Sequence, residues 1–157
     1  MSIEDRIARL EARRAIDDLI CDLARAIDAG PSADMLRPLF TDEAVFVIDQ
    51  YGEFKGADAI AAGVAGNADQ GFSWTLHYLV SPKVNLSEDI ASADIDFMLW
   101  ETATSASGRA YWIGGKYVAK VRNEKSAWRF SELRLIADLI SRYPAGWEDK
   151  PVTLASA

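Results

Sequence analysis

One polar residue stands where a purely structural role does not readily explain it. His77 is the only histidine in 157 residues. It lies within residues 72–80, a run of aromatic and β-branched residues that is typical of a β-strand. An imidazole changes its charge near neutral pH, so His77 is a candidate for acid–base chemistry. A core histidine with satisfied hydrogen bonds is the structural alternative.

Asp28 is the second candidate. Residues 2–29 show the apolar periodicity of one long helix, and Gly30 with Pro31 forms the stop signal. A carboxylate in the last turn opposes the helix dipole. Its position is easier to explain if a cation, or a group that can become one, lies nearby. A solvated aspartate at the helix end is the alternative.

The composition predicts one compact domain over residues 1–157, because half of the residues are hydrophobic. A net charge of -7 argues against binding to nucleic acid or to an anionic membrane surface. The single cysteine cannot form an internal disulfide. The sequence shows no signal peptide and no apolar run near the roughly 20 residues of a membrane span. We therefore expect a cytoplasmic protein without a membrane segment.

The elements that must position these two residues follow a simple order. Helices come first, then a short hairpin and a third helix, then long antiparallel strands. This order predicts an α+β fold in which a curved, mostly antiparallel sheet wraps around the long first helix and leaves an apolar pocket at its open end. The first helix begins its apolar stripe with Ile3, Ile7 and Leu10. We expect helices at 2–29, 32–40 and 57–67, a hairpin at 44–48 and 53–56, and strands at 72–86, 91–104, 109–121 and 127–140.

Several short motifs, taken in order, resemble the SnoaL-like branch of the nuclear-transport-factor-2-like (NTF2-like) superfamily. They are similar in particular to the scytalone dehydratase and hexachlorocyclohexane dehydrochlorinase group. The resemblance implies a cone-shaped α+β barrel with a deep hydrophobic cavity, and an assembly into dimers or trimers. We therefore expect a homo-oligomer. The motifs are Ala15-Ile16-Asp17-Asp18-Leu19, Asp28, Gly52-Glu53-Phe54-Lys55-Gly56, Thr75-Leu76-His77-Tyr78, Ile113-Gly114-Gly115 and Trp128-Arg129-Phe130.

In the dehydratase-like members, an aspartate of the first helix and a histidine of the barrel form a dyad. Their positions match Asp28 and His77. Asp28 would accept one ring N–H and stabilise the imidazolium, while His77 takes a proton from carbon. The resemblance thus implies a cofactor-independent lyase that performs a dehydratase-like elimination on a hydrophobic small molecule, aromatic or polycyclic.

Strand alternation predicts the residues around an inward-facing His77. The expected lining is apolar and aromatic, which fits a flat organic molecule, while simple core packing is the alternative for each residue. Asp94 and Asp96 alternate onto the other face. The C-terminal tail, residues 141–157, could place Trp147 over the pocket as a lid; a disordered or partner-bound tail is the alternative. The candidate substrate-binding residues are Phe46, Thr75, Phe97, Leu99, Ile113 and Tyr117.

The chain departs from the resemblance in three places, the first being Ile20, which stands where some relatives have an aromatic hydroxyl on the first helix. The arginine in the last strand of the dehydrochlorinase aligns with Leu133, whereas this chain has Arg134 one residue later. Because a one-residue offset reverses the face of a strand, we expect Arg134 to point away from the cavity. The tyrosines that polarise a carbonyl in scytalone dehydratase are matched only by the candidates Tyr51 and Tyr117, for which barrel packing with the hydroxyl at the rim is the alternative.

Other functions remain open or are disfavoured. One histidine and one cysteine do not build a usual zinc site, and we expect neither a metal nor another cofactor. An isomerase similar to ketosteroid isomerase would need an inward Asp96 beside an inward tyrosine. A non-catalytic ligand carrier or assembly subunit would be favoured if Asp28 and His77 lay too far apart to bond.

Overall fold

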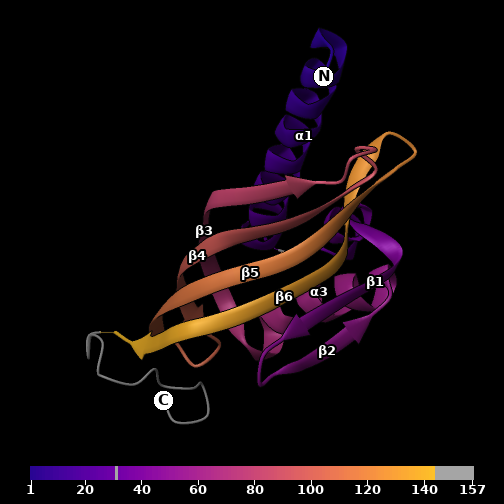
Figure 1. The fold of residues 1–157 in the computed structure, drawn as a ribbon. Helices are drawn as coiled ribbons and strands as arrows, with labels where there is room; N and C mark the ends of the chain where they lie inside the picture. The colour runs from indigo at the N-terminus through magenta and orange to yellow at the C-terminus, as the bar shows by residue number, and fades with distance from the viewer. Residues whose placement is uncertain (31, 144–157) are drawn as a thin grey trace.

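The computed structural model describes residues 1–30 and 32–143, and within them the chain forms an α+β fold, as expected. Helices pack against one six-stranded sheet (Figure 1). The elements are α1 Ile3–Asp28, α2 Ala33–Leu36, the 3-10 turn η1 Arg37–Leu39, β1 Phe40–Ile48, β2 Gly52–Lys55, α3 Ala57–Gln70, β3 Phe72–Leu86, β4 Ser92–Ser105, β5 Ala110–Glu124 and β6 Ala127–Arg142.

Helix α1 starts with a capping box. The backbone N–H of Asp5 donates to Oγ of Ser2 at 3.1 Å, and the N–H of Ser2 donates to Oδ2 of Asp5 at 3.0 Å. The C-terminal half of the helix buries an apolar face that includes Ile16 and Leu23, and it packs chiefly against β3. This packing brings the last residue of α1 to the middle of β3.

The beginning of the predicted apolar stripe is not buried within this chain. Ile3, Ile7 and Leu10 are exposed, Leu10 by 67%. In Figure 1 the N-terminal part of α1 extends beyond the sheet, and the part of the chain that the structure describes leaves these side chains exposed. Periodicity correctly predicted the helix, but it could not predict how far the helix projects past its own sheet.

The strands lie in the order β2-β1-β6-β5-β4-β3, with β2 and β3 at the edges. Among the described strands, β1 and β6 pair in parallel and the other neighbours pair antiparallel. The parallel pair joins the start of the sheet to its last strand, which places β6 inside the sheet. Because β3 is an edge strand, one side of it is open to the end of α1.

Two of the register irregularities lie within the long strands β3 and β5. The register of β3 on β4 shifts between Val80 and Lys83, and Ser81 there has a φ of 56°. The register of β5 on β6 shifts between Gly114 and Gly115. A Cβ on Gly115 would collide with the backbone of Ile136, so the close approach at this bulge needs a glycine.

Alternation along the long strands separates two faces, as predicted. The face toward α1 carries the core, including Phe97 and Leu99, whereas Asp94 and Asp96 are exposed on the opposite, outer face. Among the helices that the structure describes, none has the length and apolar character needed to cross a membrane.

Candidate active site

Asp28 is bound by three groups of β3. Its Oδ1 accepts the hydroxyl of Thr75 at 3.0 Å and lies 2.7 Å from Nδ1 of His77. Its Oδ2 accepts the backbone N–H of His77 at 2.8 Å. These partners explain a carboxylate at the C-terminal end of a helix: hydrogen bonds from the edge strand offset the unfavourable helix dipole.

These contacts select one tautomer of His77. Because Asp28 is an acceptor, Nδ1 carries the proton and Nε2 keeps its lone pair. The side chain of His77 is 6% exposed and that of Asp28 is 20% exposed. The Asp28–His77 pair that the resemblance implied therefore exists, and Nε2 of His77 is directed toward Glu101 on the inner face of the sheet.

Glu101 is a site residue that the sequence reasoning missed. It lies on β4 directly opposite His77, on the same inner face, and is 5% exposed. Its Oε2 lies 3.4 Å from Nε2 of His77. Alternation from Phe97 and Leu99 leads to position 101, so continuing that pattern by two residues would have found it.

The electrostatics of the three groups are coupled. Burial acts to raise the pKa of Asp28, but hydrogen bonds from His77 and Thr75 outweigh it and hold the pKa below its ordinary value. Burial acts to lower the pKa of His77, but the Asp28 hydrogen bond and the charges of Glu101 and Asp28 raise it. Burial raises the pKa of Glu101, with a further contribution from Asp28 and opposition from His77. Asp28 is thus the anion of the group.

Six residues were predicted to line a pocket, and all lie on the inner face or in contact with the dyad. Thr75 binds Asp28, and Ile113 is the strand partner of Glu101. The ring of Tyr117 stacks on Phe97 with centroids 5.2 Å apart and lies 6.4 Å from that of Phe46. Leu99 is buried and lies on β4 between Phe97 and Glu101. Their role in binding a substrate stays a prediction.

The two tyrosine candidates lie in different environments. Tyr117 is buried, and its burial together with the charges of Glu101 and Asp28 raises the pKa of its hydroxyl, which stays protonated. Tyr51 lies in the turn after β1 and is 45% exposed. Trp147, the predicted lid, falls outside the described residues.

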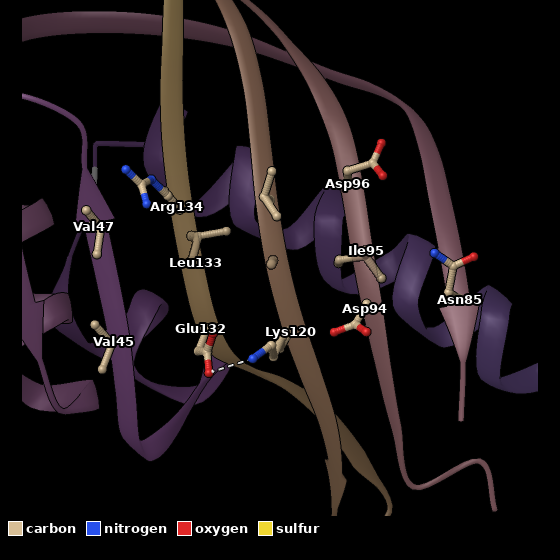
Figure 2. Close-up of a pocket in the computed structure, with 12 residues that line it drawn as sticks. Val45, Val47, Asn85, Asp94, Ile95, Asp96, Lys120, Glu132, Leu133 and Arg134 are labelled. Carbon is tan, nitrogen blue, oxygen red and sulfur yellow. Dashed lines mark hydrogen bonds and ion pairs between the residues drawn. The ribbon is translucent and has the colours of Figure 1, made fainter. Parts of the chain in front are cut away.

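Arg134 lies on the outer face, as the one-residue offset predicted. It is exposed, and its Nε and Nη2 bind Oδ1 of Asp49 at 2.9 and 2.8 Å. It lines a groove of about 460 Å³ together with Asp96 (Figure 2). Leu133, by contrast, is buried. Asp28, His77 and Glu101 do not line this groove. The groove is therefore separate from the site around His77.

The positions of Asp96, Asp28 and His77 bear on two alternatives, the isomerase and the non-catalytic carrier. Asp96 points outward, so the inward aspartate that the isomerase reading needed is not there. Asp28 and His77 bond directly, so the separation that would favour a carrier is absent. Within the described ranges, no group of three or more His, Cys, Asp or Glu residues has the arrangement of a metal site.

Fold and site together define an α+β domain with a hydrogen-bonded Asp–His pair on the inner face of its sheet. A profile of the SnoaL-like domain matches residues 8–134, and the chain belongs to this family. Among curated proteins, none matches the sequence significantly.

Solved structures with the same fold include enzymes. A type 2 hexachlorocyclohexane dehydrochlorinase (LinA) shares 20% identity and a TM-score of 0.81, over 93% of this chain and 98% of its own. A Novosphingobium aromaticivorans protein with the provisional name scytalone dehydratase has 18% identity and a TM-score of 0.79, over 94% and 97%. An NTF2-like superfamily protein from Salmonella enterica serovar Typhimurium has 17% identity and a TM-score of 0.74, over 88% and 99%. At these identities the likeness establishes the NTF2-like fold.

Proposed function

We propose that this protein is a cofactor-independent lyase that eliminates water from a hydrophobic small molecule, with His77 as the base. The observation that carries the proposal is the 2.7 Å contact between Nδ1 of His77 and Oδ1 of Asp28. It leaves Nε2 as a base whose protonated form is stabilised by an adjacent anion.

The reaction follows from that geometry. Nε2 of His77 takes a proton from a carbon next to an electron-withdrawing group, such as a ketone. The C–H electron pair forms the C=C bond, the neighbouring C–O bond breaks, and the oxygen leaves as water after it gains a proton. Asp28 holds the imidazolium in place and compensates its charge. Positioned general-base help of this kind contributes about 10²–10⁴-fold to a rate.

The substrate class is argued from the inner face. Apart from Glu101, the buried side chains that β4 and β5 place on the inner face are aliphatic and aromatic, including Phe97, Tyr117 and Ile113. Such surroundings favour a flat, largely apolar molecule with one or two polar groups. A β-hydroxy ketone on an aromatic or bicyclic ring combines an acidic C–H with a hydroxyl leaving group and meets these requirements.

Water is a better candidate leaving group here than chloride. The dehydrochlorinase with the same fold acts, by its name, on hexachlorocyclohexane. In this chain the aligned position is the buried Leu133, and Arg134 is bound to Asp49 on the outer face. We therefore expect no chloride release from hexachlorocyclohexane under conditions in which a β-hydroxy ketone is dehydrated.

The proposal is tested with a panel of aromatic and bicyclic β-hydroxy ketones, in which enone formation is followed by ultraviolet absorbance and water loss by mass spectrometry. His77→Gln should fold normally and lose about 10²–10⁴-fold in kcat on any substrate that the wild type dehydrates. Asp96→Asn, on the outer face, is the control and should keep full activity. Normal turnover by His77→Gln would refute the proposed base.

A further inference from the structure

Glu101 is a buried carboxyl group that the dyad by itself does not explain. It stands across the sheet from His77 in an antiparallel pair, and its Oε2 lies 3.4 Å from Nε2, the nitrogen that Asp28 leaves unprotonated. Its side chain is 7% exposed, close to the 6% of His77. An uncompensated charge at this depth is costly, so the group needs a proton or a cation.

The proton count of the cluster follows from its neighbours. Asp28 receives hydrogen bonds from Thr75 and from the backbone and ring of His77, so it is ionised. Burial and the charges of Glu101 and Asp28 raise the pKa of Tyr117 on β5, so its hydroxyl stays protonated and adds no charge to the cluster. With Asp28 ionised, we place one further proton on either Nε2 of His77 or Oε2 of Glu101, whose 3.4 Å separation lets the charge of one compensate the other. In the neutral arrangement the imidazole is a base and Glu101 is a carboxylic acid.

We propose that Glu101 is the general acid of the elimination and protonates the departing hydroxyl. This step rests on the proposed function, because it uses His77 as the base. Nε2 of His77 takes the proton from carbon, the C=C bond forms, and the C–O electron pair goes to the oxygen. That oxygen takes the proton of Glu101 and leaves as water. The products of the step are the enone, water, an imidazolium and the Glu101 carboxylate.

The short distance between the two groups has two consequences. The imidazolium and the carboxylate are direct neighbours, so one proton transfer from Nε2 to Oε2 restores both groups without a base from solvent. In addition, both groups approach the substrate from the same side, because they project from adjacent strands onto one face. The hydrogen and the hydroxyl must then leave from the same face of the substrate, which is a syn elimination.

A first test needs no substrate, because the chain has a single histidine and its ring signals in an NMR spectrum are unambiguous. Glu101→Gln removes the carboxylate that compensates the charge of the imidazolium, so the pKa of His77 should fall. Asp96→Asn changes an exposed carboxylate of the same strand on the other face and should leave that pKa in place. An unchanged pKa in Glu101→Gln would overturn the shared proton, whatever the substrate is.

A second test separates an acid from a structural residue. On a β-hydroxy ketone, Glu101→Gln should lose about 10²–10⁴-fold in kcat. On the matching β-acetoxy ketone, whose acetate leaves without a proton, most of that loss should disappear, whereas the loss in His77→Gln should persist. Glu101→Asp, which keeps an acid on a shorter stem, should fall between the wild type and Glu101→Gln and checks that the site still folds.

The outcomes distinguish the two proposals. An equal loss on both substrates would overturn Glu101 as the acid while leaving His77 as the base. Full activity of His77→Gln would overturn the proposed function itself. A stereospecifically deuterated substrate reports the geometry: retention of the syn deuterium in the product, which means anti elimination, would contradict the arrangement on one face.

Discussion

At the scale of single residues, the site consists of one imidazole between two carboxyl groups whose pKa values are shifted in opposite directions. Asp28 is held as an anion by hydrogen bonds, and Glu101 is held toward its protonated form by burial, which raises its pKa. His77 lies between them at 2.7 and 3.4 Å. Environments that separate the pKa values of two like groups are the usual way in which a protein assigns them different roles.

Replacing Asp28 by asparagine tests whether the negative charge of its carboxylate stabilises the folded protein. In the folded protein the pKa of Asp28 is lowered, so its stabilising effect is present above its unfolded pKa of about 3.9 and is lost as pH falls through the folded value. The pKa of His77 is raised, so its effect is present below about 6.5 and is lost as pH rises through the folded value. Asp28→Asn should therefore destabilise by about 1–3 kcal/mol, mostly between these two titrations.

Urea unfolding at a series of pH values measures this difference. The gap between wild type and Asp28→Asn should narrow below pH about 4, and again as pH rises through the folded pKa of His77. Asp96→Asn should show no such profile, because that carboxylate is exposed on the outer face. A gap that does not vary with pH would mean that Asp28 is not paired with an ionisable partner.

The residues of the site differed in how far the sequence could predict them. His77 and Asp28 each break a local rule, one as the lone histidine of an apolar strand and the other as an acid at the wrong end of a helix, and both could be found. Glu101 becomes unusual only once it is known that its position on β4 faces the buried side of the sheet, where charged residues are rare. A charged residue near the end of a strand is ordinary until its neighbours show that it is buried.

At the scale of elements, strand periodicity and turn residues predicted the helices and strands nearly in full, because these signals are local. The parallel pairing of β1 with β6 and the reach of α1 past the sheet are set by contacts distant in sequence, which periodicity does not carry. The contact that forms the site is also of this type: the end of α1 meets β3 across 49 residues.

A pair of glycine variants tests the bend in β5. Gly115→Ala should destabilise the protein by about 1–3 kcal/mol, because the added Cβ collides with the backbone of Ile136. Gly66→Ala should stabilise it by about 0.5–1 kcal/mol, since position 66 is helical with open space around it. Both free energies of unfolding come from urea titrations. A neutral Gly115→Ala would show that the bulge does not need its glycine.

At the scale of the whole molecule, two apolar surfaces are left uncovered by the described chain. One is the stripe of Ile3, Ile7 and Leu10 on the projecting part of α1. The other, which we call the outer patch, lies on the outer face of β3 and β4, where Tyr78 pairs with Trp100 and Val80 with Met98. Surfaces of this kind are typical of interaction sites. The outer patch comprises Trp74, Leu76, Tyr78, Val80 and Met98.

We predict that a second copy of this chain covers the outer patch, in keeping with the expected dimer or trimer. Sedimentation velocity over a range of concentrations should show a homo-oligomer. Tyr78→Glu should shift it toward monomer without unfolding it, whereas Asp94→Asn, elsewhere on the same face, should not. If Ile7→Glu dissociates the assembly and Tyr78→Glu does not, the interface is the stripe of α1. A wild-type monomer at every concentration would contradict the prediction.

The central claim is that Asp28 holds His77 with Nδ1 protonated and Nε2 available as the base. The most direct test is the ¹⁵N NMR spectrum of the single imidazole as a function of pH. We predict a pKa above the ordinary value of about 6.5 and, above that pKa, a neutral ring with its proton on Nδ1. A neutral ring protonated on Nε2, or a pKa below the ordinary value, would contradict the account.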